Sequence, residues 1–584
     1  MVRGFFVKSI LMKSPKVLLY PTGIFIIALI ARLIGIRWGL PDSLHWYSYH
    51  PDEYQIFSSV ANLDFFNGKF NPHFFNYPSL FIYLVYIAHL LFSGFGVFTL
   101  NANDPNFIWQ WPQQILLTAR WLSALFGAGT AVLVFTIIKS WRPKLHIAYA
   151  IFGGLLMAFV PGHVQHSHFA TVDVAATFFV ALSLWLAIYI QHSPHSARTF
   201  LWSCFVAGLA AATKYNVGIV VLAPLCVLFL DEHLRPRVKV LLPALVGITF
   251  LGFVIGCPYS ILHFHEFWGN GQNTGVAYEL LVHPHQGQGD VFTATGNGWL
   301  YHLTTNLPFV LTWPLLLLCL LGIWRICAAK EISKQRWPLL IFIGVFFLSL
   351  GFSQVRFMRY VLPLIPPLIV LAVFGARWIK VLFGKKISIA ICGTIFLIAF
   401  WGSINALSNF VSIDPRTNAA EYINFQLGRI NSQGPHILLP KGSTVTEQPV
   451  TVGMIDVPRF WSPPIVPQNI IFGSNLTLTD IEKTDPNHRF HFEVIGFDAK
   501  KLHQQQPQWF VMSEFEWRDE ERLRPQEFDR FMEELRNLYE LKKSYKNHPW
   551  LALPGRAFVP HDFLYTNPEI QIYQLRSEPL KSEF

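Results

Sequence analysis

VLLYPTGIFIIALIARLIGIR, from Val17 to Arg37, is the stretch that decides the fold. Its residues are almost all apolar, and its length matches the roughly 20 residues that a helix needs to cross the hydrocarbon core of a bilayer. Similar apolar blocks recur as far as residue 408. Only 14% of the 584 residues are charged, whereas a soluble chain carries about 25%. The sequence therefore predicts an α-helical polytopic membrane protein.

These apolar blocks predict about eleven membrane spans, together with interfacial helices. The predicted spans are 17–37, 115–139, 146–162, 173–191, 199–213, 215–230, 238–257, 307–328, 337–353, 360–379 and 387–408. Residues 80–98 are also apolar, but they would invert every later loop if they crossed. The basic loops then face the side of the N-terminus only if 80–98 makes no net crossing, and basic loops favour the cytoplasm. We therefore predict that 80–98 lies in the interface or re-enters the membrane.

This orientation divides the chain into two domains. Residues 1–409 are expected to form the membrane domain, with a first outer loop at 38–114 and a large outer loop at 258–306. Residues 410–584 are far more polar and are expected to form a soluble α/β domain on the outer face. Alternating apolar residues predict strands at 507–517 and 569–575, and an amphipathic pattern predicts a helix at 525–546.

Acidic residues near the outer ends of spans are the first candidates for chemistry. Asp52 and Glu53 stand side by side in YSYHPDEYQIF, which begins at residue 47, and Asp173 opens a later span. All three also suit the ordinary role of an acid at a helix start. Neighbouring residues on a helix point about 100° apart. One carboxylate of the pair is therefore expected to face a site while the other pairs or holds structure.

Four cations lie near the same membrane face: Arg120, Lys214, Arg356 and Arg359. Lys and Arg at such positions often reach toward lipid phosphates simply to leave the hydrocarbon. Together with carboxylates they also make a suitable cradle for an anionic lipid head group. We therefore predict that these cations bind the phosphate of a lipid.

Histidines raise the question of a metal. His163 and His166 share a spacing that can place both on one helix face, and His263, His265 and Glu266 stand within four residues of one another. Such side chains are good ligands for zinc and related metals. Interfacial segments rich in aromatic residues account for the same pattern without a metal. The sequence leaves a divalent metal open and does not require a cofactor.

An ordered set of motifs resembles a known family. The motifs are HPDE (50–53), FNYPSLFIYL (75–84), ARWLSALFGAGTAVLVF (119–135), VPGHVQHSHFATVDVAATFF (160–179), GLAAATKYN (208–216), RFMRYVLPLIPPL (356–368) and DPRTNAAEYI (414–423). In this order they resemble the membrane glycosyltransferases of the C fold. The most similar members are the bacterial polyprenyl-phosphate-sugar-dependent enzymes related to protein O-mannosyltransferases and to the lipid A aminoarabinose transferase.

The resemblance implies transfer of a hexose or pentose from a polyprenyl-phosphate carrier to an extracytoplasmic glycolipid, glycan or protein, with inversion at the anomeric carbon. It places the catalytic base at Asp52 or Glu53, with Asp52 preferred, and a second acid at Asp173. Lys214, Arg356 and Arg359 correspond to cations on the phosphate side. The implied location is the bacterial inner membrane, with the active site and the C-terminal domain on the outer face. Nucleic acid is not an expected partner.

Two other functions fit an outward cluster of charges. A membrane transporter would use the charges as a substrate path, and it would be expected to show repeated halves with interrupted spans. The sequence shows no such repeat. A non-catalytic envelope-assembly protein would use its C-terminal domain to bind partners. It would keep its function after loss of Asp52, Asp173 and Lys214, whereas an enzyme would not.

Overall fold

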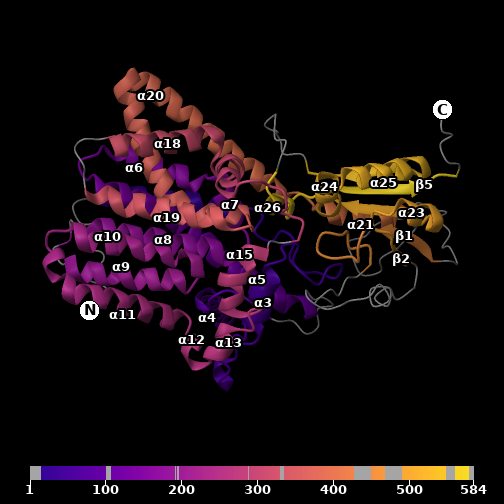
Figure 1. Ribbon diagram of the computed structural model, residues 1–584, viewed down its shortest axis with the longest axis horizontal. Helices are drawn as coiled ribbons and strands as arrows, with labels where there is room; N and C mark the ends of the chain where they lie inside the picture. The colour runs from indigo at the N-terminus through magenta and orange to yellow at the C-terminus, as the bar shows by residue number, and fades with distance from the viewer. Residues whose placement is uncertain are drawn as a thin grey trace.

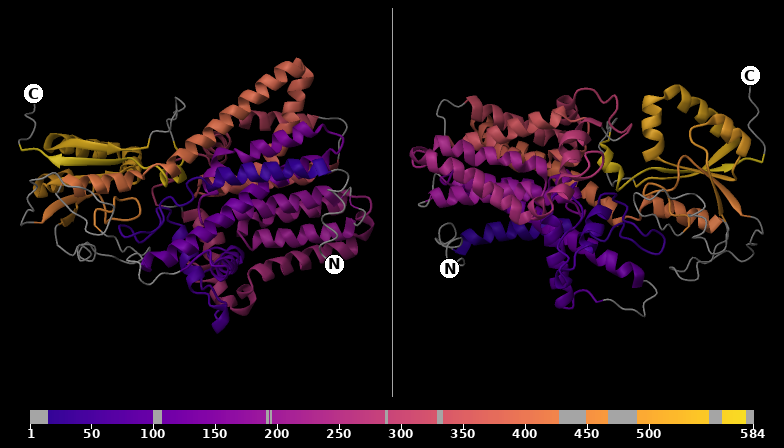
Figure 2. Two further views of the ribbon diagram at one scale, coloured as in Figure 1. Left: turned by 180° about the vertical axis from the view of Figure 1, so that it is seen from behind. Right: turned by 60° about the horizontal axis from the view of Figure 1, so that its bottom comes forward.

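The protein was analysed as a computed structural model, which describes residues 15–99, 107–190, 193, 196–286, 289–328, 334–426, 449–466, 490–547 and 559–577. Figure 1 shows a bundle of long helices at one end and a smaller α/β part at the other end. Most of the long helices run along the same direction, and the second view in Figure 2 keeps the two parts apart. The fold is therefore a helical membrane part followed by a small C-terminal sheet part.

The helical part is built from a succession of apolar helices. They are α2 (Pro15–Leu33), α5 (Phe107–Trp141), α6 (Ile147–Ala158), α8 (Val172–Tyr189), α9 (Ser196–Ala211), α10 (Leu222–Leu230), α11 (Val238–Gly256), α18 (Trp313–Ala328), α19 (Trp337–Phe352) and α20 (Ile365–Val411). Among the described residues, five helical segments are long and apolar enough to cross a membrane, or six if one bent pair counts as a span. Four shorter apolar helices accompany them. A multi-pass architecture is therefore confirmed, and the count of eleven spans stays a prediction.

One predicted span differs in shape from a straight helix. The segment predicted at 307–328 is bent by 113° between α17 (Leu307–Leu311) and α18. Thr312 stands at the bend with φ of +81°, a backbone conformation outside the helical region. The span predicted at 360–379 begins in the 3₁₀ segment Met358–Leu364 and continues into α20, which also contains the span predicted at 387–408. The helix is interrupted at Gly384, where φ is +81°, within the gap predicted between these two spans. Periodicity alone cannot detect the break at Thr312.

The segment predicted to avoid a net crossing forms α4 (Leu80–Gly94), a helix of 15 residues. At 1.5 Å per residue it is about 22 Å long, which is less than the roughly 30 Å of a bilayer core. It packs against α5 and against the short helix α3 (Glu53–Ala61) of the first outer loop. Its position relative to the membrane stays a prediction.

The C-terminal part is a five-stranded mixed sheet in the order β2-β1-β3-β5-β4. The strands are β1 (Val450–Met454), β2 (Phe490–Val494), β3 (Trp509–Ser513), β4 (Tyr539–Tyr545) and β5 (Ile570–Leu575). Helices α23 (Ala499–Gln505), α24 (Glu514–Leu523) and α25 (Pro525–Leu538) accompany it. The predicted α/β character and the closing strand are therefore confirmed. The boundary placed between residues 409 and 410 stays a prediction, since α20 continues to Val411.

Two predicted elements of this part were too long. The strand predicted at 507–517 ends at Ser513, because that side chain caps α24 and forms a capping box with Glu516. The helix predicted at 525–546 ends at Leu538, and the chain continues directly as β4. Residues 539–545 form an edge strand antiparallel to β5, and this pairing outweighs their helical propensity.

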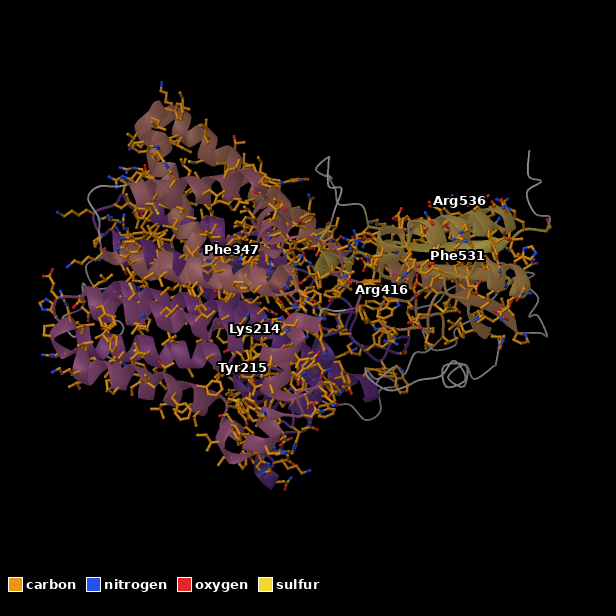
Figure 3. All side chains as sticks on the ribbon, viewed as in Figure 1. Lys214, Tyr215, Phe347, Arg416, Phe531 and Arg536 are labelled. Atoms are coloured by element: carbon orange, nitrogen blue, oxygen red, sulfur yellow. The ribbon has the colours of Figure 1, made fainter. Side chains whose placement is uncertain are left out.

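The helical and C-terminal parts share a hydrophobic core. Trp38, Tyr49 and Phe410 cluster with strand residues of the sheet and with Tyr565. Arg416, which Figure 3 labels where the two parts meet, is fully buried there. Its guanidinium pairs with Asp414 at 2.7 Å and donates hydrogen bonds to the carbonyls of Phe460 and Tyr565. This interface fixes the C-terminal part against the outer loops.

Candidate active site

A cavity of about 1190 Å³ lies where the outer loops meet the C-terminal part. Its walls come from the first outer loop, the chain after α9, the large outer loop, the turn before α20 and the C-terminal part. The polar and titratable side chains on these walls include Asp52, Tyr77, Lys214, Glu279, His283, Arg359, Tyr360, His561 and Tyr565. Segments far apart in the sequence thus enclose one polar chamber.

Asp52 immediately precedes α3 and lines the cavity. One of its carboxylate oxygens lies 2.9 Å from Nη2 of Arg359, and 21% of its side chain stays exposed. Burial raises the pKa of Asp52, and the positive charge of Arg359 opposes that rise. A carboxylate with a raised pKa holds a proton more tightly, which makes it a stronger base. Asp52 therefore combines access to the cavity with a raised pKa.

Glu53 points away from the cavity into the protein. Arg120 donates two hydrogen bonds to it, at 2.8 and 2.7 Å, and the backbone N–H of Ala170 donates a third at 2.6 Å. Ser48 donates to the same carboxylate. Burial alone would raise the Glu53 pKa, but the charge and hydrogen bonds of Arg120 hold that pKa below its ordinary value. Glu53 lies outside the cavity lining, as expected for the structural member of an adjacent pair.

Arg120 is placed differently from the phosphate-binding role predicted for it. Its side chain is 1% exposed, and beyond Glu53 it donates to the carbonyls of Ile36 and Trp38. These contacts leave no free face toward the cavity, so the guanidinium ties α5 to the first outer loop. Sequence reasoning missed this because an outward arginine and a buried one give the same local pattern.

Lys214 lines the cavity with Asp173 behind it. The lysine Nζ lies 2.6 Å from Oδ1 of Asp173 and 4.4 Å from the ring centroid of Tyr360. Asp173 is 3% exposed and opens α8. Figure 3 labels Lys214 and the adjacent Tyr215 at the end of the helical part that faces the large outer loop. The pair brings one cation to the cavity and compensates its charge from the protein side.

Arg359 is the second cation of the cavity. It lies between two carboxylates, with Nη1 3.1 Å from Asp562 and Nη2 2.9 Å from Asp52. The guanidinium also lies 3.9 Å from the ring centroid of Phe357. Arg356 points elsewhere and donates to the hydroxyl of Thr295 at 2.7 Å and to the carbonyl of Gly296 at 2.8 Å. Of the two arginines, only Arg359 lines the cavity.

The predicted metal ligands are not gathered into one site. Nδ1 of His163 lies 3.1 Å from Arg32, while Nε2 of His166 lies 3.8 Å from Asp562. Glu266 accepts hydrogen bonds from Asn71 and His73, and its other near neighbour is His263 at 3.7 Å. His265 is exposed. Within the described ranges, no group of three His, Cys, Asp or Glu side chains could hold a metal ion.

Two acidic residues of the site escaped the sequence analysis. Glu279 lies in the π-helical turn Tyr278–Val282 of the large outer loop and lines the cavity. Burial raises its pKa to about 7. Asp562 belongs to the C-terminal part, where the sequence analysis named no candidate residue, and it is fully buried. A single acid in a polar segment carries no local signal, so only the tertiary contacts reveal both residues.

The comparisons with known proteins support a relationship to sugar transferases. Residues 114–259 match the family model described as dolichyl-phosphate-mannose-protein mannosyltransferase. This range includes Arg120, Asp173 and Lys214. The match confirms the resemblance to C-fold membrane glycosyltransferases related to the protein O-mannosyltransferases. Among curated proteins, no sequence matches.

Several solved structures are similar in outline. ArnT from Cupriavidus metallidurans bound to undecaprenyl phosphate has a TM-score of 0.47 and 15% identity, covering 95% of this chain and 98% of that one. The oligosaccharyltransferase AglB from Archaeoglobus fulgidus, in complex with an inhibitory peptide and a dolichol-phosphate, has a TM-score of 0.46 and 13% identity, covering 95% and 78%. The Pmt1-Pmt2 complex of S. cerevisiae has a TM-score of 0.33 and 16% identity, covering 44% and 34%. Because these TM-scores are below 0.5, the relationship to sugar transferases rests on the family match over residues 114–259.

Proposed function

We propose that this protein is an inverting glycosyltransferase. It moves a hexose or pentose from a polyprenyl-phosphate carrier to an acceptor hydroxyl on a glycolipid, a glycan or a protein outside the cytoplasm. One observation carries the proposal: the Asp52 carboxylate and the cations Lys214 and Arg359 line the same cavity at the end of the helical part. A base and a phosphate-binding pair are the two devices that such a transfer needs.

The chemistry follows from the positions of these side chains. Asp52 accepts the proton of the acceptor hydroxyl as its oxygen attacks the anomeric carbon. The bond between that carbon and the phosphate oxygen breaks on the opposite face of the sugar, so a single displacement inverts the configuration. The leaving polyprenyl phosphate gains negative charge, which Lys214 and Arg359 stabilise. No metal is required by this scheme, and the described histidines supply no cluster for one.

The arrangement of charges links donor binding to activation of the base. Both cations are already paired with carboxylates, at 2.6 Å for Lys214 and 2.9 Å for Arg359. An arriving phosphate therefore competes with Asp52 for Nη2 of Arg359, because Nη1 is held by Asp562. Release of Asp52 from that contact further increases its basicity, because a departing positive neighbour raises a carboxylate pKa. Donor binding thus activates the base.

The enclosing walls suit an acceptor that enters from the outer side. The cavity is roofed by Phe515, His561 and Tyr565 of the C-terminal part. Its other walls lie at the ends of the apolar helices, where a carrier phosphate attached to a membrane-embedded chain would arrive. We place this end of the bundle on the outer face of a bacterial inner membrane, in keeping with the basic loops at the other ends of the spans.

The first experiment identifies the sugar-bearing product that the protein makes in cells. Mass spectrometry of cell-envelope glycolipids, glycans and proteins, with and without the gene, identifies the sugar and the acceptor. The purified full-length protein in nanodiscs is then given that donor and acceptor. Wild type is expected to transfer the sugar with inversion, and Asp52→Asn is expected to be inactive.

Asp64 provides a matched control from the same outer loop. It caps the short turn at Phe65–Asn67 and does not line the cavity, so Asp64→Asn should transfer sugar as wild type does. An envelope that is unchanged without the protein, or turnover retained by a folded Asp52→Asn protein, would remove the proposed mechanism.

A further inference from the structure

Asp52, Asp173, Lys214, Arg359 and Asp562 form the charged cluster at the cavity. Of these five residues, only Asp562 comes from the C-terminal part. It lies in the helical turn α26 (His561–Leu564) and is fully buried. One carboxylate oxygen accepts the backbone N–H of Met358 at 2.9 Å. The other accepts the backbone N–H of Arg359 at 3.2 Å and its side chain at 3.1 Å. The Asp562 carboxylate therefore binds both the backbone and the arginine side chain of the segment that precedes α20.

These hydrogen bonds determine where the Arg359 guanidinium points. With Nη1 taken by Asp562, only Nη2 is directed to Asp52. A guanidinium released from Asp562 could turn both arms of its fork onto one carboxylate, the bidentate geometry that arginine prefers. It would then occupy Asp52 completely. The Asp562 contact keeps the arginine divided between the two carboxylates and open to a third anion.

Asp562 also changes the balance of charge around the base. Three carboxylates, those of Asp52, Asp173 and Asp562, face two cations, Lys214 and Arg359. Burial alone would raise the Asp562 pKa, but the Arg359 charge and the two backbone N–H donors hold it below its ordinary value. Asp562 is therefore ionised, and its negative charge contributes to raising the pKa of Asp52.

Other titratable groups face Asp52 and Asp562, and any pH experiment must distinguish their titrations from those of the two carboxylates. They are His50, Tyr77, His166, Glu279, His283, Tyr360, His561 and Tyr565. Burial lowers the pKa of His50 to about 3 and that of His561 to about 4, so both are neutral at physiological pH. Burial raises the pKa of Glu279 to about 7, so this carboxyl titrates within the same experiment and calls for its own variant.

We propose that Asp562 is a positioning residue of the active site, by which the C-terminal part holds Arg359 available to the donor phosphate and only partly paired with Asp52. The inference rests on the proposed function, because it assigns Asp562 a role through two residues of that mechanism. It makes the C-terminal part a component of the catalytic machinery as well as a cover over it.

The decisive variant is Asp562→Asn in the full-length protein in nanodiscs. Loss of the negative charge and closer pairing of Arg359 with Asp52 both lower the Asp52 pKa. The acidic limb of the pH profile of kcat/KM should therefore move to lower pH. A guanidinium that is displaced by about 1 Å can cost roughly 10- to 100-fold in kcat. Affinity for polyprenyl phosphate, measured without an acceptor, should also fall.

Asp414→Asn is the matched control for a purely structural effect. Asp414 is another buried acid at the junction of the two parts, and it pairs with Arg416 at 2.7 Å. It is expected to lower thermal stability without moving the acidic limb. Asp562→Glu, which keeps the charge, is expected to keep the wild-type limb while losing part of kcat. Glu279→Gln in the Asp562→Asn background isolates the limb that belongs to Asp52.

The outcomes separate the two proposals. A wild-type protein that neither binds polyprenyl phosphate nor transfers a sugar overturns the proposed function. An active wild type whose Asp562→Asn variant keeps the acidic limb in place, and behaves like Asp414→Asn, overturns the positioning role alone. Should Asp562→Asn fail to fold, Asp562→Glu decides, since a limb that shifts despite the retained charge also contradicts the inference.

Discussion

Asp52 and Glu53 are adjacent in the first outer loop, but their carboxylates have opposite surroundings. The Glu53 region is closed: Arg120, Ser48 and Ala170 all donate to a carboxylate that is fully buried. The Asp52 region is open, since Asp52 shares Arg359 with another acid and lines a large cavity. One region satisfies its charge completely and the other leaves it incomplete. Stability is therefore expected to depend on the first region and chemistry on the second.

Glu53→Gln should have the largest effect on the protein as a whole. It leaves the Arg120 guanidinium charged and buried without its partner, and breaking a buried pair from one side costs about 3–5 kcal/mol. We expect poor membrane yield and a markedly lower thermal midpoint, measured on purified protein. A Glu53→Gln protein that keeps its stability but loses transfer would reverse the roles given to the two carboxylates.

Asp52→Asn should lose activity and keep the fold. Removal of a general base lowers the rate by about 10²- to 10⁴-fold, while the amide still accepts a hydrogen bond from Arg359. Steady-state transfer and a thermal melt of the same preparation measure the two effects together. A variant with a strongly lowered melting temperature would place Asp52 with Glu53 in the structural class.

Lys214→Gln should weaken donor binding by roughly tenfold, which corresponds to about 1.4 kcal/mol of binding free energy. The change removes a cation from the cavity and leaves Asp173 without the partner that lies 2.6 Å away. Lys214→Arg keeps the charge and should recover most of the affinity. The readout is binding of polyprenyl phosphate in nanodiscs, and equal affinity for Lys214→Gln and wild type would exclude Lys214 from the phosphate site.

Glu279→Gln should alter the pH dependence of donor binding. Burial raises the Glu279 pKa to about 7, so this carboxyl is neutral below that pH and negative above it. The wild-type affinity for an anionic lipid phosphate should then fall as pH rises through about 7. Stability contributed by the protonated form is lost over the same range, because the folded pKa lies above the ordinary value of the unfolded chain. Glu279→Gln should flatten both curves, and an unchanged affinity profile would show that the Glu279 charge does not act on the bound donor.

Arg356→Gln should have the smallest effect. This arginine donates to Thr295 and Gly296 and does not line the cavity. Donor affinity and kcat are expected to stay near wild type, in contrast to the same change at Arg359. A loss comparable to that of Arg359→Gln would show that the large outer loop rearranges and brings Arg356 to the phosphate.

Much of the site was open to prediction from the sequence, with revealing exceptions. The adjacent acids were expected to separate into a facing and a pairing member, and their geometry follows that expectation. Lys214 and Arg359 line the cavity, whereas Arg120 and Arg356 lie in other contacts. All four had the same local signature of a cation near a span end. Which of them finds a carboxylate or a carbonyl depends on residues that are distant along the chain.

The sequence by itself determined the helical membrane architecture, because the length and the apolarity of each block are local properties. It also determined the sheet character of the C-terminal part through alternation. Only the tertiary structure decided the bend at Thr312, the end of α25 at Leu538 and the entry of Asp562 into the charged cluster. Each of these depends on which surfaces meet. Burial and ion pairing are set by neighbours in space, which local composition does not encode.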